Sequence, residues 1–260
     1  MAVRRFSVEE IAGITGGRAA RGAAVPVSGL SLDSRRTAGG SLFACLKGER
    51  TDGHDYAAAA VAGGAVAVLA ERELALPGGA GLVVVPSVER AVRDLGREAR
   101  RGFRGEVVGV VGSCGKTTTK DFTAAILALA CAVSATEGNL NNLLGLPQTL
   151  MAADQEARFL VLEMGISRPG EMEELAPIAE PTAVVFTTIQ PVHIEFFTSL
   201  DAILEEKAKV LRWTRGGGFA ALNADDPLLR ALPLPEGISA QPYGCSQEAP
   251  VRVRREKRVP

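Results

Sequence analysis

The apolar positions of the first hundred residues alternate between helix and strand patterns. A helix is predicted to begin at Ser7, a favoured cap residue, and to end at Gly16, a favoured stop. The alanine-rich stretch 56–62 predicts a second helix. Three apolar runs predict strands, residues 41–46, 65–69 and 81–85, and the alanine-rich stretch lies between the first two. This alternation favours a small α/β unit with a partly parallel sheet.

A break in the pattern separates this unit from the rest of the chain. Residues 88–101 form an amphipathic, strongly charged segment that predicts a helix, and Gly102-Phe103-Arg104-Gly105 interrupts it. Domain boundaries fall in such breaks. We therefore expect an N-terminal domain over residues 1–104 and a second domain over residues 105–260, incomplete at its C-terminal end.

The second domain opens with residues 106–111, a nearly unbroken apolar run typical of a strand buried on both faces of a parallel sheet. Three more runs predict strands: residues 159–163, 183–188 and 218–222. Four segments with helical patterns alternate with them: residues 116–129, 143–151, 172–178 and 200–213. The fold class is therefore α/β, with a doubly wound second domain. The basic tail 251–258 fits either a further strand or a solvated end.

Composition narrows the class of protein and of partner. Of 260 residues, 47% are hydrophobic and 23% charged, a balance typical of globular proteins. The formal net charge of -1 gives no general attraction to nucleic acid or anionic lipid, so we expect small-molecule partners. The four cysteines include no C-x-x-C pair, which favours reduced thiols. No apolar run reaches the roughly 20 residues of a membrane span, and the N-terminus lacks the core of a signal peptide. We expect a cytoplasmic location.

A glycine-rich segment between the strand 106–111 and the next helix predicts a phosphate-binding loop. Its candidate residues are Gly112, Ser113, Cys114, Gly115, Lys116, Thr117 and Thr118. Glycines let backbone N–H groups face phosphate oxygens, Lys116 can reach the β- and γ-phosphates, and the Thr117 hydroxyl can ligate Mg²⁺. The usual first glycine is replaced by Val110, so an incidental turn is the alternative. Cys114 is either a small loop residue or a reactive thiol at a helix N-terminus. ATP is the expected ligand.

The run Gly112-x-x-Gly115-Lys116-Thr117-Thr118 resembles the ATP loop of the Mur ligases and their relatives, the folylpolyglutamate and cyanophycin synthetases. The chain departs from that family at two positions, where the family commonly has threonine in place of Val111 and asparagine in place of Cys114. The resemblance implies ATP and Mg²⁺ as cofactors.

Three further residues carry candidate chemistry in the second domain. Glu163 ends an apolar strand, where the ligand sites of α/β sheets lie. His193 is one of two histidines, and by itself a lone histidine is more often structural than a ligand. The resemblance implies that Glu163 and His193 hold Mg²⁺ with Thr117. It also implies a carbamylated, metal-associated lysine at Lys207, for which a surface lysine is the alternative.

Other motifs match the family's substrate-binding runs in order along the chain. Asn139, Asn141 and Asn142 lie in a G-N-x-N-N run, which from the residues alone is a turn. The resemblance implies that this run faces the nucleotide substrates, and that Asn223 and Asp226 meet the adenosine. It also implies that Leu32 and Ser34 bind the UDP moiety. Without it, the neighbouring Asp33 and Arg35 form a local salt bridge.

The asparagine run is most like that of the family member that adds D-alanyl-D-alanine to UDP-N-acetylmuramoyl-tripeptide. The resemblance therefore implies peptide ligation through an acyl phosphate, with Lys116, Glu163, His193 and Lys207 as the catalytic set, in peptidoglycan synthesis and hence in cell shape and division. We expect a monomer that lacks the family's C-terminal domain and has weak activity alone. Two alternatives stay open: a nucleotide-binding remnant without catalysis, and another ligase of the superfamily.

Overall fold

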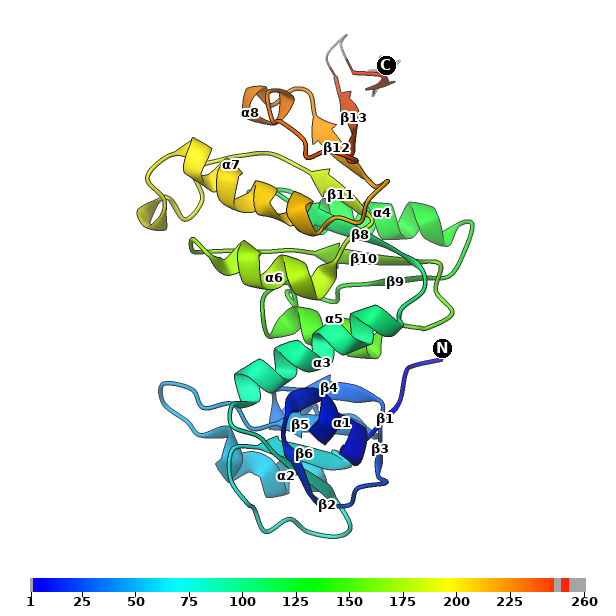
Figure 1. Ribbon diagram of the computed structural model, residues 1–260, viewed down its shortest axis with the longest axis vertical. Coiled ribbons are helices and arrows are strands. Elements are labelled where there is room, and N and C mark those ends of the chain that lie inside the picture. Colours follow the sequence, from blue (N-terminus) through cyan, green and yellow to red (C-terminus); the bar gives the residue numbers. More distant parts are fainter. Residues whose placement is uncertain (1, 246–248, 253–260) are drawn as a thin grey trace, which may run out of the picture. The chain divides into compact units, whose positions relative to one another are not determined.

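The computed structural model describes residues 2–245 and 249–252 (Figure 1). Within those residues the chain forms two compact units. Unit 1 contains the chain up to Arg104 together with Glu137–Ala157, and unit 2 contains Gly105–Thr136 and the chain from Arg158 onward. The segment Glu137–Ala157, which the sequence places in the second domain, thus packs with unit 1. The reason is its helix α5 (Gly145–Ala152), which contacts the helix α3 (Val88–Gly102) and a strand of unit 1.

Unit 1 is built on a five-stranded sheet, counted within the described residues. Its strand order is β2 (Arg18–Arg21), β7 (Gly81–Val84), β6 (Ala67–Ala70), β5 (Ser41–Ala44) and β4 (Gly29–Ser31). β2 runs antiparallel to β7, whereas the other neighbours are parallel. A small antiparallel pair joins β1 (Phe6–Ser7) to β3 (Pro26–Val27). The predicted partly parallel sheet is therefore present.

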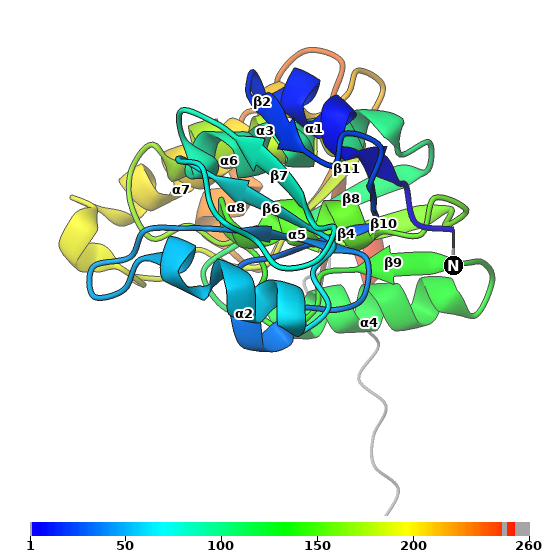
Figure 2. The same ribbon diagram turned by 90° about the horizontal axis from the view of Figure 1, so that it is seen from below.

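Helices cover both faces of the unit 1 sheet. α1 (Val8–Thr15) and α2 (Ala57–Ala62) lie on opposite faces (Figure 2). α1 begins where predicted, because the Ser7 side chain accepts from the Glu10 amide and the Glu10 carboxylate accepts from the Ser7 amide. It ends at Gly16, whose φ of 64° is in the left-handed region that favours glycine. Two short 3-10 helices, η1 (Ser34–Arg36) and η2 (Gly53–Tyr56), follow β4 and β5.

Unit 2 is built on a sheet of seven parallel strands within the part of the chain that the structure describes. Its order is β14 (Val251–Arg252), β13 (Ser239–Gly244), β12 (Phe219–Asn223), β11 (Ala183–Phe186), β8 (Glu106–Val111), β10 (Phe159–Glu163) and β9 (Val133–Ala135). Every pair is parallel. The predicted doubly wound α/β fold is confirmed. Of the basic tail, Val251 and Arg252 form β14, and residues 253–258 lie outside the described residues.

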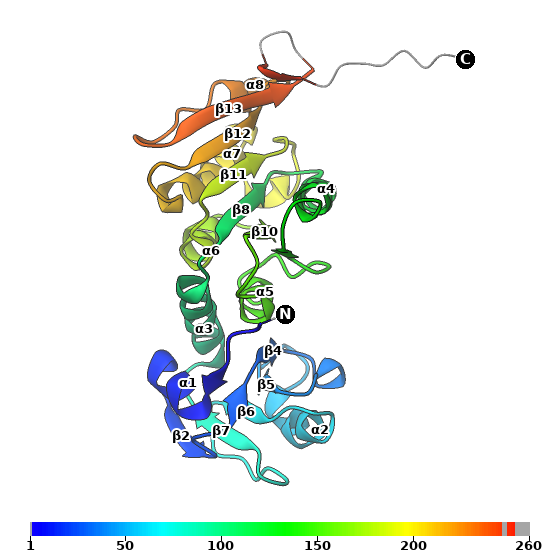
Figure 3. The ribbon, with the colours of Figure 1, turned by 90° about the vertical axis from the view of Figure 1, so that its right-hand side faces the viewer.

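Helices pack on both faces of this second sheet. α4 (Lys116–Ala128) contacts β8, β9 and β10, and α6 (Glu171–Ala179) lies on the opposite face (Figure 3). The predicted helix 200–213 consists of α7 (Leu200–Ala208) followed by the 3-10 helix η4 (Lys209–Trp213). Two short elements complete the unit: η3 (Ile194–Phe196) and α8 (Pro227–Arg230). No helix among the described residues is long and apolar enough to span a membrane.

The strand order places the loop after β8 at the switch point of the sheet. β9 and β10 lie on one side of β8, and β11 to β14 lie on the other. In such sheets the ligand crevice opens at the carboxyl ends of the strands where the order reverses. The segments that follow β8, β10, β11 and β12 therefore meet along one edge of unit 2.

Candidate functional site

The loop between β8 and α4 has the backbone of a phosphate cradle. Gly112 has a φ of 150° and Gly115 a φ of 79°, both in the region that favours glycine. A Cβ on Gly112 would lie 1.9 Å from Thr187 Oγ1. α4 begins directly after Gly115, and the first N–H groups of a helix have no partner within it. The loop can thus present several N–H donors to one anion.

Hydrogen bonds from the end of β11 hold this loop in place. The Ser113 hydroxyl donates to Gln190 O at 3.0 Å and accepts from Gln190 N at 2.9 Å, and Ser113 N donates to Thr188 O at 2.7 Å. Thr187 Oγ1 donates to Cys114 O at 2.6 Å. The carbonyl of Cys114 is therefore engaged while its side chain is exposed.

Two lysines bring positive charge to the loop. Lys116 is the first residue of α4, and its Nζ donates to Ser113 O at 3.1 Å. Lys207 on α7 is 2% exposed. Its burial, and then the repulsion from Lys116, lower the pKa of Lys207 to about 8. Because its side chain is buried, the alternative of a surface lysine at Lys207 is wrong.

Glu163 ends β10 and is 3% exposed. Its amide donates to Thr136 Oγ1 at 3.1 Å, and the carbonyl of Thr136 accepts from Lys120 Nζ at 2.7 Å. Lys120 also pairs with Asp121 at 2.7 Å. Sequence reasoning missed Lys120, although its spacing of one helical turn from Lys116 is a signal that could have found it. Lys120 fixes the strand end that carries the Glu163 carboxylate.

His193 lies at the same edge of unit 2 and is exposed. Its φ of 57° is unusual for a residue with a side chain, and such strain is concentrated at functional sites. Within residues 2–245 and 249–252, however, no group of three or more histidine, cysteine, aspartate or glutamate side chains could hold a metal ion. The structure thus brings Glu163 and His193 to one edge without gathering a ready-made metal cluster.

Asn223 and Asp226, at the end of β12, use their side chains to hold the chain itself. Asn223 Nδ2 donates to Thr187 O at 2.9 Å, and Asn223 Oδ1 accepts from Asp225 N at 3.0 Å. Asp226 Oδ2 accepts from Ile189 N at 2.7 Å, and its Oδ1 caps α8 by accepting from Leu228 N at 3.0 Å. Both residues therefore brace the segment that leads from β11 to His193.

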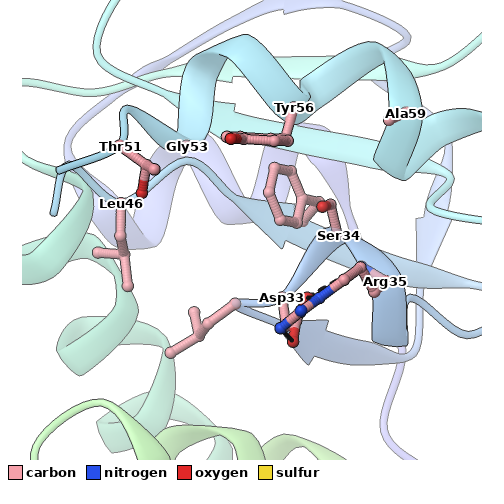
Figure 4. Close-up of a pocket in the computed structure, with 10 residues that line it drawn as sticks. Asp33, Ser34, Arg35, Leu46, Thr51, Gly53, Tyr56 and Ala59 are labelled. Atoms are coloured by element: carbon pink, nitrogen blue, oxygen red, sulfur yellow. Dashed lines mark hydrogen bonds and ion pairs between the residues drawn. The ribbon is translucent and has the colours of Figure 1, made fainter.

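Unit 1 has a pocket of its own, with a volume of about 670 Å³ (Figure 4). The residues that line it come from β5 and from the segments after β4 and β5: Leu32, Asp33, Ser34, Arg35, Phe43, Leu46, Thr51, Gly53, Tyr56 and Ala59. Leu32 and Ser34 are the predicted substrate residues. Arg35 pairs with Asp33 at 2.8 Å, as predicted from the residues alone, and its hydrogen bonds lower the pKa of Asp33 to about 2. Figure 4 shows Tyr56 across the pocket from this pair.

The asparagine run of unit 1 forms the turn that precedes α5. Asn142 Oδ1 accepts from Gly145 N at 2.8 Å and from Leu144 N at 3.2 Å, so this side chain holds the start of the helix. Asn141 N donates to Asn139 O at 2.8 Å. This is the turn and cap that the residue types alone predict.

Comparison with known proteins identifies both halves of the chain. Residues 26–104 match the Mur ligase family, catalytic domain, and residues 110–258 match the Mur ligase middle domain. The UDP-N-acetylmuramoyl-tripeptide--D-alanyl-D-alanine ligase of Bacillus subtilis is 36% identical over 205 residues, which cover 78% of this chain and 45% of that relative. The ligase of the same name from Escherichia coli is 35% identical over 208 residues, 79% of this chain and 45% of the relative.

Solved structures agree with these sequence matches. A crystal structure of MurF from Acinetobacter baumannii superposes with a TM-score of 0.82 at 26% identity, over 97% of this chain and 55% of that chain. MurF ligase from Thermotoga maritima, in complex with ADP, gives a TM-score of 0.73 at 34% identity, over 84% of this chain and 51% of that chain. The chain spans about 45% of the length of the curated relatives. With the middle-domain match covering residues 110–258, the chain belongs to the Mur ligase family.

Proposed function

We propose that this chain carries the nucleotide-sugar and ATP sites of a ligase that adds D-alanyl-D-alanine to UDP-N-acetylmuramoyl-tripeptide. The two relatives described above bear the name of that activity. The observation that supports it most is the glycine cradle of unit 2 with Lys116 and Lys207 beside it. Backbone N–H groups and the cationic side chain of Lys116 suit the triphosphate of ATP.

Each residue of the loop has a role in ATP binding under this proposal. Backbone N–H groups of residues 112–118 surround the β- and γ-phosphates, and Lys116 turns from Ser113 O toward them. Asn223 and Asp226 hold the segment 187–189, and through it they shape the part of the site that would take the adenosine. The resemblance implies a direct contact with adenosine instead. Asn139, Asn141 and Asn142 stay candidates for substrate contact.

The donor atoms of unit 2 fit Mg²⁺. Magnesium takes oxygen ligands, and it is commonly held by one or two carboxylates together with substrate phosphates and water. Glu163 offers a carboxylate and Thr117 a hydroxyl, so a dense cluster of protein ligands is not required. When bound, the ion would neutralise charge on the phosphates. His193 is the weaker candidate as a ligand, because magnesium prefers oxygen to imidazole nitrogen.

The lowered pKa of Lys207 supports its carbamylation. The neutral amine is the form that attacks carbon dioxide, and the resulting carbamate would replace a repelled ammonium beside Lys116 with an attracted anion. The proton lost by the amine passes to solvent. We therefore keep Lys207 in the catalytic set as a carbamate that would help to hold the metal.

The proposed reaction proceeds in two steps. The terminal carboxylate of the tripeptide attacks the γ-phosphate of ATP, ADP leaves, and an acyl phosphate forms. The amine of D-alanyl-D-alanine then attacks the acyl carbon, loses a proton and expels phosphate. Lys116 and the loop amides stabilise the charge that develops on the transferred phosphoryl group. In unit 1, Leu32 and Ser34 contribute to the pocket that would take the UDP moiety.

Isothermal titration calorimetry of MgATP into the chain tests the nucleotide site. We expect binding by the natural sequence and at least a tenfold loss in Lys116→Met, about 1.4 kcal/mol. Lys47→Met is the matched control, since Lys47 is an exposed lysine of unit 1. Absence of heat from correctly folded natural protein would reject the proposal. Ligation is measured in a separate assay, as the release of ADP in the presence of ATP, UDP-N-acetylmuramoyl-tripeptide and D-alanyl-D-alanine.

A further inference from the structure

One wall of the unit 1 pocket is anchored from behind by a buried histidine. Gly53 and Tyr56, the two ends of η2, line the pocket. His54 lies between them and is only 5% exposed, whereas Tyr56 is 45% exposed. The short helix thus presents its tyrosine to the pocket and its histidine to the interior.

The contacts of His54 fix the position of its ring proton. Nδ1 lies 2.5 Å from Asp52 Oδ1, and Nε2 lies 2.9 Å from the backbone nitrogen of Glu71. A backbone N–H can only donate, so Nε2 is the acceptor and carries no proton. The proton is therefore on Nδ1, where it faces the Asp52 carboxylate.

Charged neighbours keep this arrangement in place. The amide and the ring of His54, and then Arg72, lower the pKa of Asp52 well below its usual range by hydrogen bonding. Arg72 Nη1 is 3.1 Å from Asp52 Oδ2 and Arg72 Nη2 is 3.7 Å from Asp55. Burial, and then the charge of Asp52, raise the pKa of the Cys45 thiol to about 12, so that thiol stays neutral. Asp52 is thus the ionised partner of a neutral imidazole.

The turn before η2 is closed by its own backbone and also lines the pocket. Gly53 N donates to Leu46 O at 2.8 Å, and Gly48 N donates to Thr51 O at 2.9 Å. A Cβ on Gly53 would lie 2.6 Å from Leu46 O, so only glycine permits this approach. Leu46 and Thr51 of this turn face the same pocket as Tyr56.

We infer that His54 is a positioning residue for the nucleotide-sugar substrate. Its bond to the Glu71 amide ties η2 to the carboxyl end of β6, seventeen positions along the chain, and so holds Tyr56 and Thr51 in the arrangement that binds the UDP moiety. This inference rests on the proposed function of the pocket, and it assigns to His54 no contact with substrate.

Two substitutions of His54 test the hydrogen bonds of its two ring nitrogens separately. The amide nitrogen of His54→Asn lies where Nδ1 does and keeps the bond to Asp52, but it offers no acceptor to Glu71. The amide oxygen of His54→Gln reaches the place of Nε2 and keeps that acceptor. Calorimetry with UDP-N-acetylmuramoyl-tripeptide and the full 260-residue chain should show a Kd raised about tenfold in His54→Asn and less than about threefold in His54→Gln. Both variants should bind MgATP like the natural protein.

Each result is decisive. The inference is overturned if His54→Asn binds UDP-N-acetylmuramoyl-tripeptide with the affinity of the natural protein, or if both variants lose affinity equally. The proposed function stands in either case. Absence of substrate binding by the natural protein overturns both. Should His54→Asn fail to fold, nitrogen-15 spectra of the natural protein with bound substrate decide, because a proton on Nε2 contradicts the proposed contact with Glu71.

Discussion

The hydroxyl of Ser113 both donates to and accepts from the backbone of Gln190, at 3.0 and 2.9 Å. These residues are 77 positions apart in the chain, and the pair joins the phosphate loop to the segment that ends at His193. A single hydroxyl thus couples the residues proposed to hold the phosphates to a proposed metal-site residue.

Replacing Ser113 by alanine removes both bonds. Each hydrogen bond contributes about 1 kcal/mol, so we expect the Kd for MgATP to rise by about tenfold or more in Ser113→Ala. Ser113→Thr keeps the hydroxyl, so its Kd for MgATP should stay nearer to that of the natural protein. Calorimetry measures the effect, and Ser239→Ala is a control because Ser239 begins β13, which β12 and β11 separate from β8. Unchanged affinity in Ser113→Ala contradicts the coupling.

Gly112→Ala tests the cradle itself. Its φ of 150° disfavours alanine, and the new Cβ would lie 1.9 Å from Thr187 Oγ1. Backbone strain of this kind costs about 1–3 kcal/mol, so the loop must shift and nucleotide affinity should fall at least tenfold. The control is Gly216→Ala, since a Cβ there meets nothing within 4 Å. We would measure MgATP binding and thermal unfolding of both variants, and equal affinities would show that the loop tolerates the shift.

The apolar runs predicted the central strands of unit 2 because those strands are buried on both faces. In β8, Val107, Val110 and Val111 are fully buried, and burial of each such side chain contributes about 1.5–3 kcal/mol. The edge strand β9, and β13 next to the other edge, were not predicted from the sequence. The sequence of β13, Ser-Ala-Gln-Pro-Tyr-Gly, has no apolar alternation, and Gly244 is its one buried residue. A strand of this kind is specified by the strand it pairs with rather than by its own pattern.

The candidate site, like the sheet, was predicted from the sequence only in part. Local patterns are sufficient to place Lys116 at a helix start and Glu163 at a strand end, because strand, loop and helix follow one another in sequence. The bonds that brace them join distant segments, such as Lys120 to Thr136 and Asp226 to Ile189. No local pattern encodes such pairs. For the same reason the sequence could not show that residues 137–157 pack with unit 1.

The bracing role of Asp226 can be distinguished from a direct contact with adenosine. Asp226→Asn weakens either the hydrogen bond that this side chain accepts from Ile189 N or the hydrogen bond that caps α8. The expected cost is about 1–3 kcal/mol. Affinity for MgATP and MgGTP should then fall by the same factor. Competition calorimetry with both nucleotides measures this ratio. Asp225→Asn is the control, since Asp225 accepts instead from Cys245 N. A loss confined to ATP would favour the direct contact.

Lys207 should make the stability of the protein depend on alkaline pH. Its pKa is about 8 in the folded chain and 10.5 when unperturbed, a difference worth about 3 kcal/mol at 1.36 kcal/mol per pH unit. Below pH 8 both states carry the proton, and the folded state bears the full cost of burying the charge. Between pH 8 and 10.5 only the unfolded state holds the proton, so the free energy of unfolding rises with pH.

Lys207→Met removes this titration and keeps a buried side chain of similar length. We therefore expect Lys207→Met to be more stable than the natural protein at pH 7, by up to about 3 kcal/mol, and the difference to shrink as the pH approaches 10.5. Urea unfolding at pH 7, 8.5 and 10, in buffers free of bicarbonate, measures it. Lys47→Met, which changes an exposed lysine, should follow the natural curve. A constant difference between Lys207→Met and the natural protein would mean that Lys207 does not titrate in this range. Added bicarbonate should stabilise the natural protein alone, because only its neutral amine can form the carbamate.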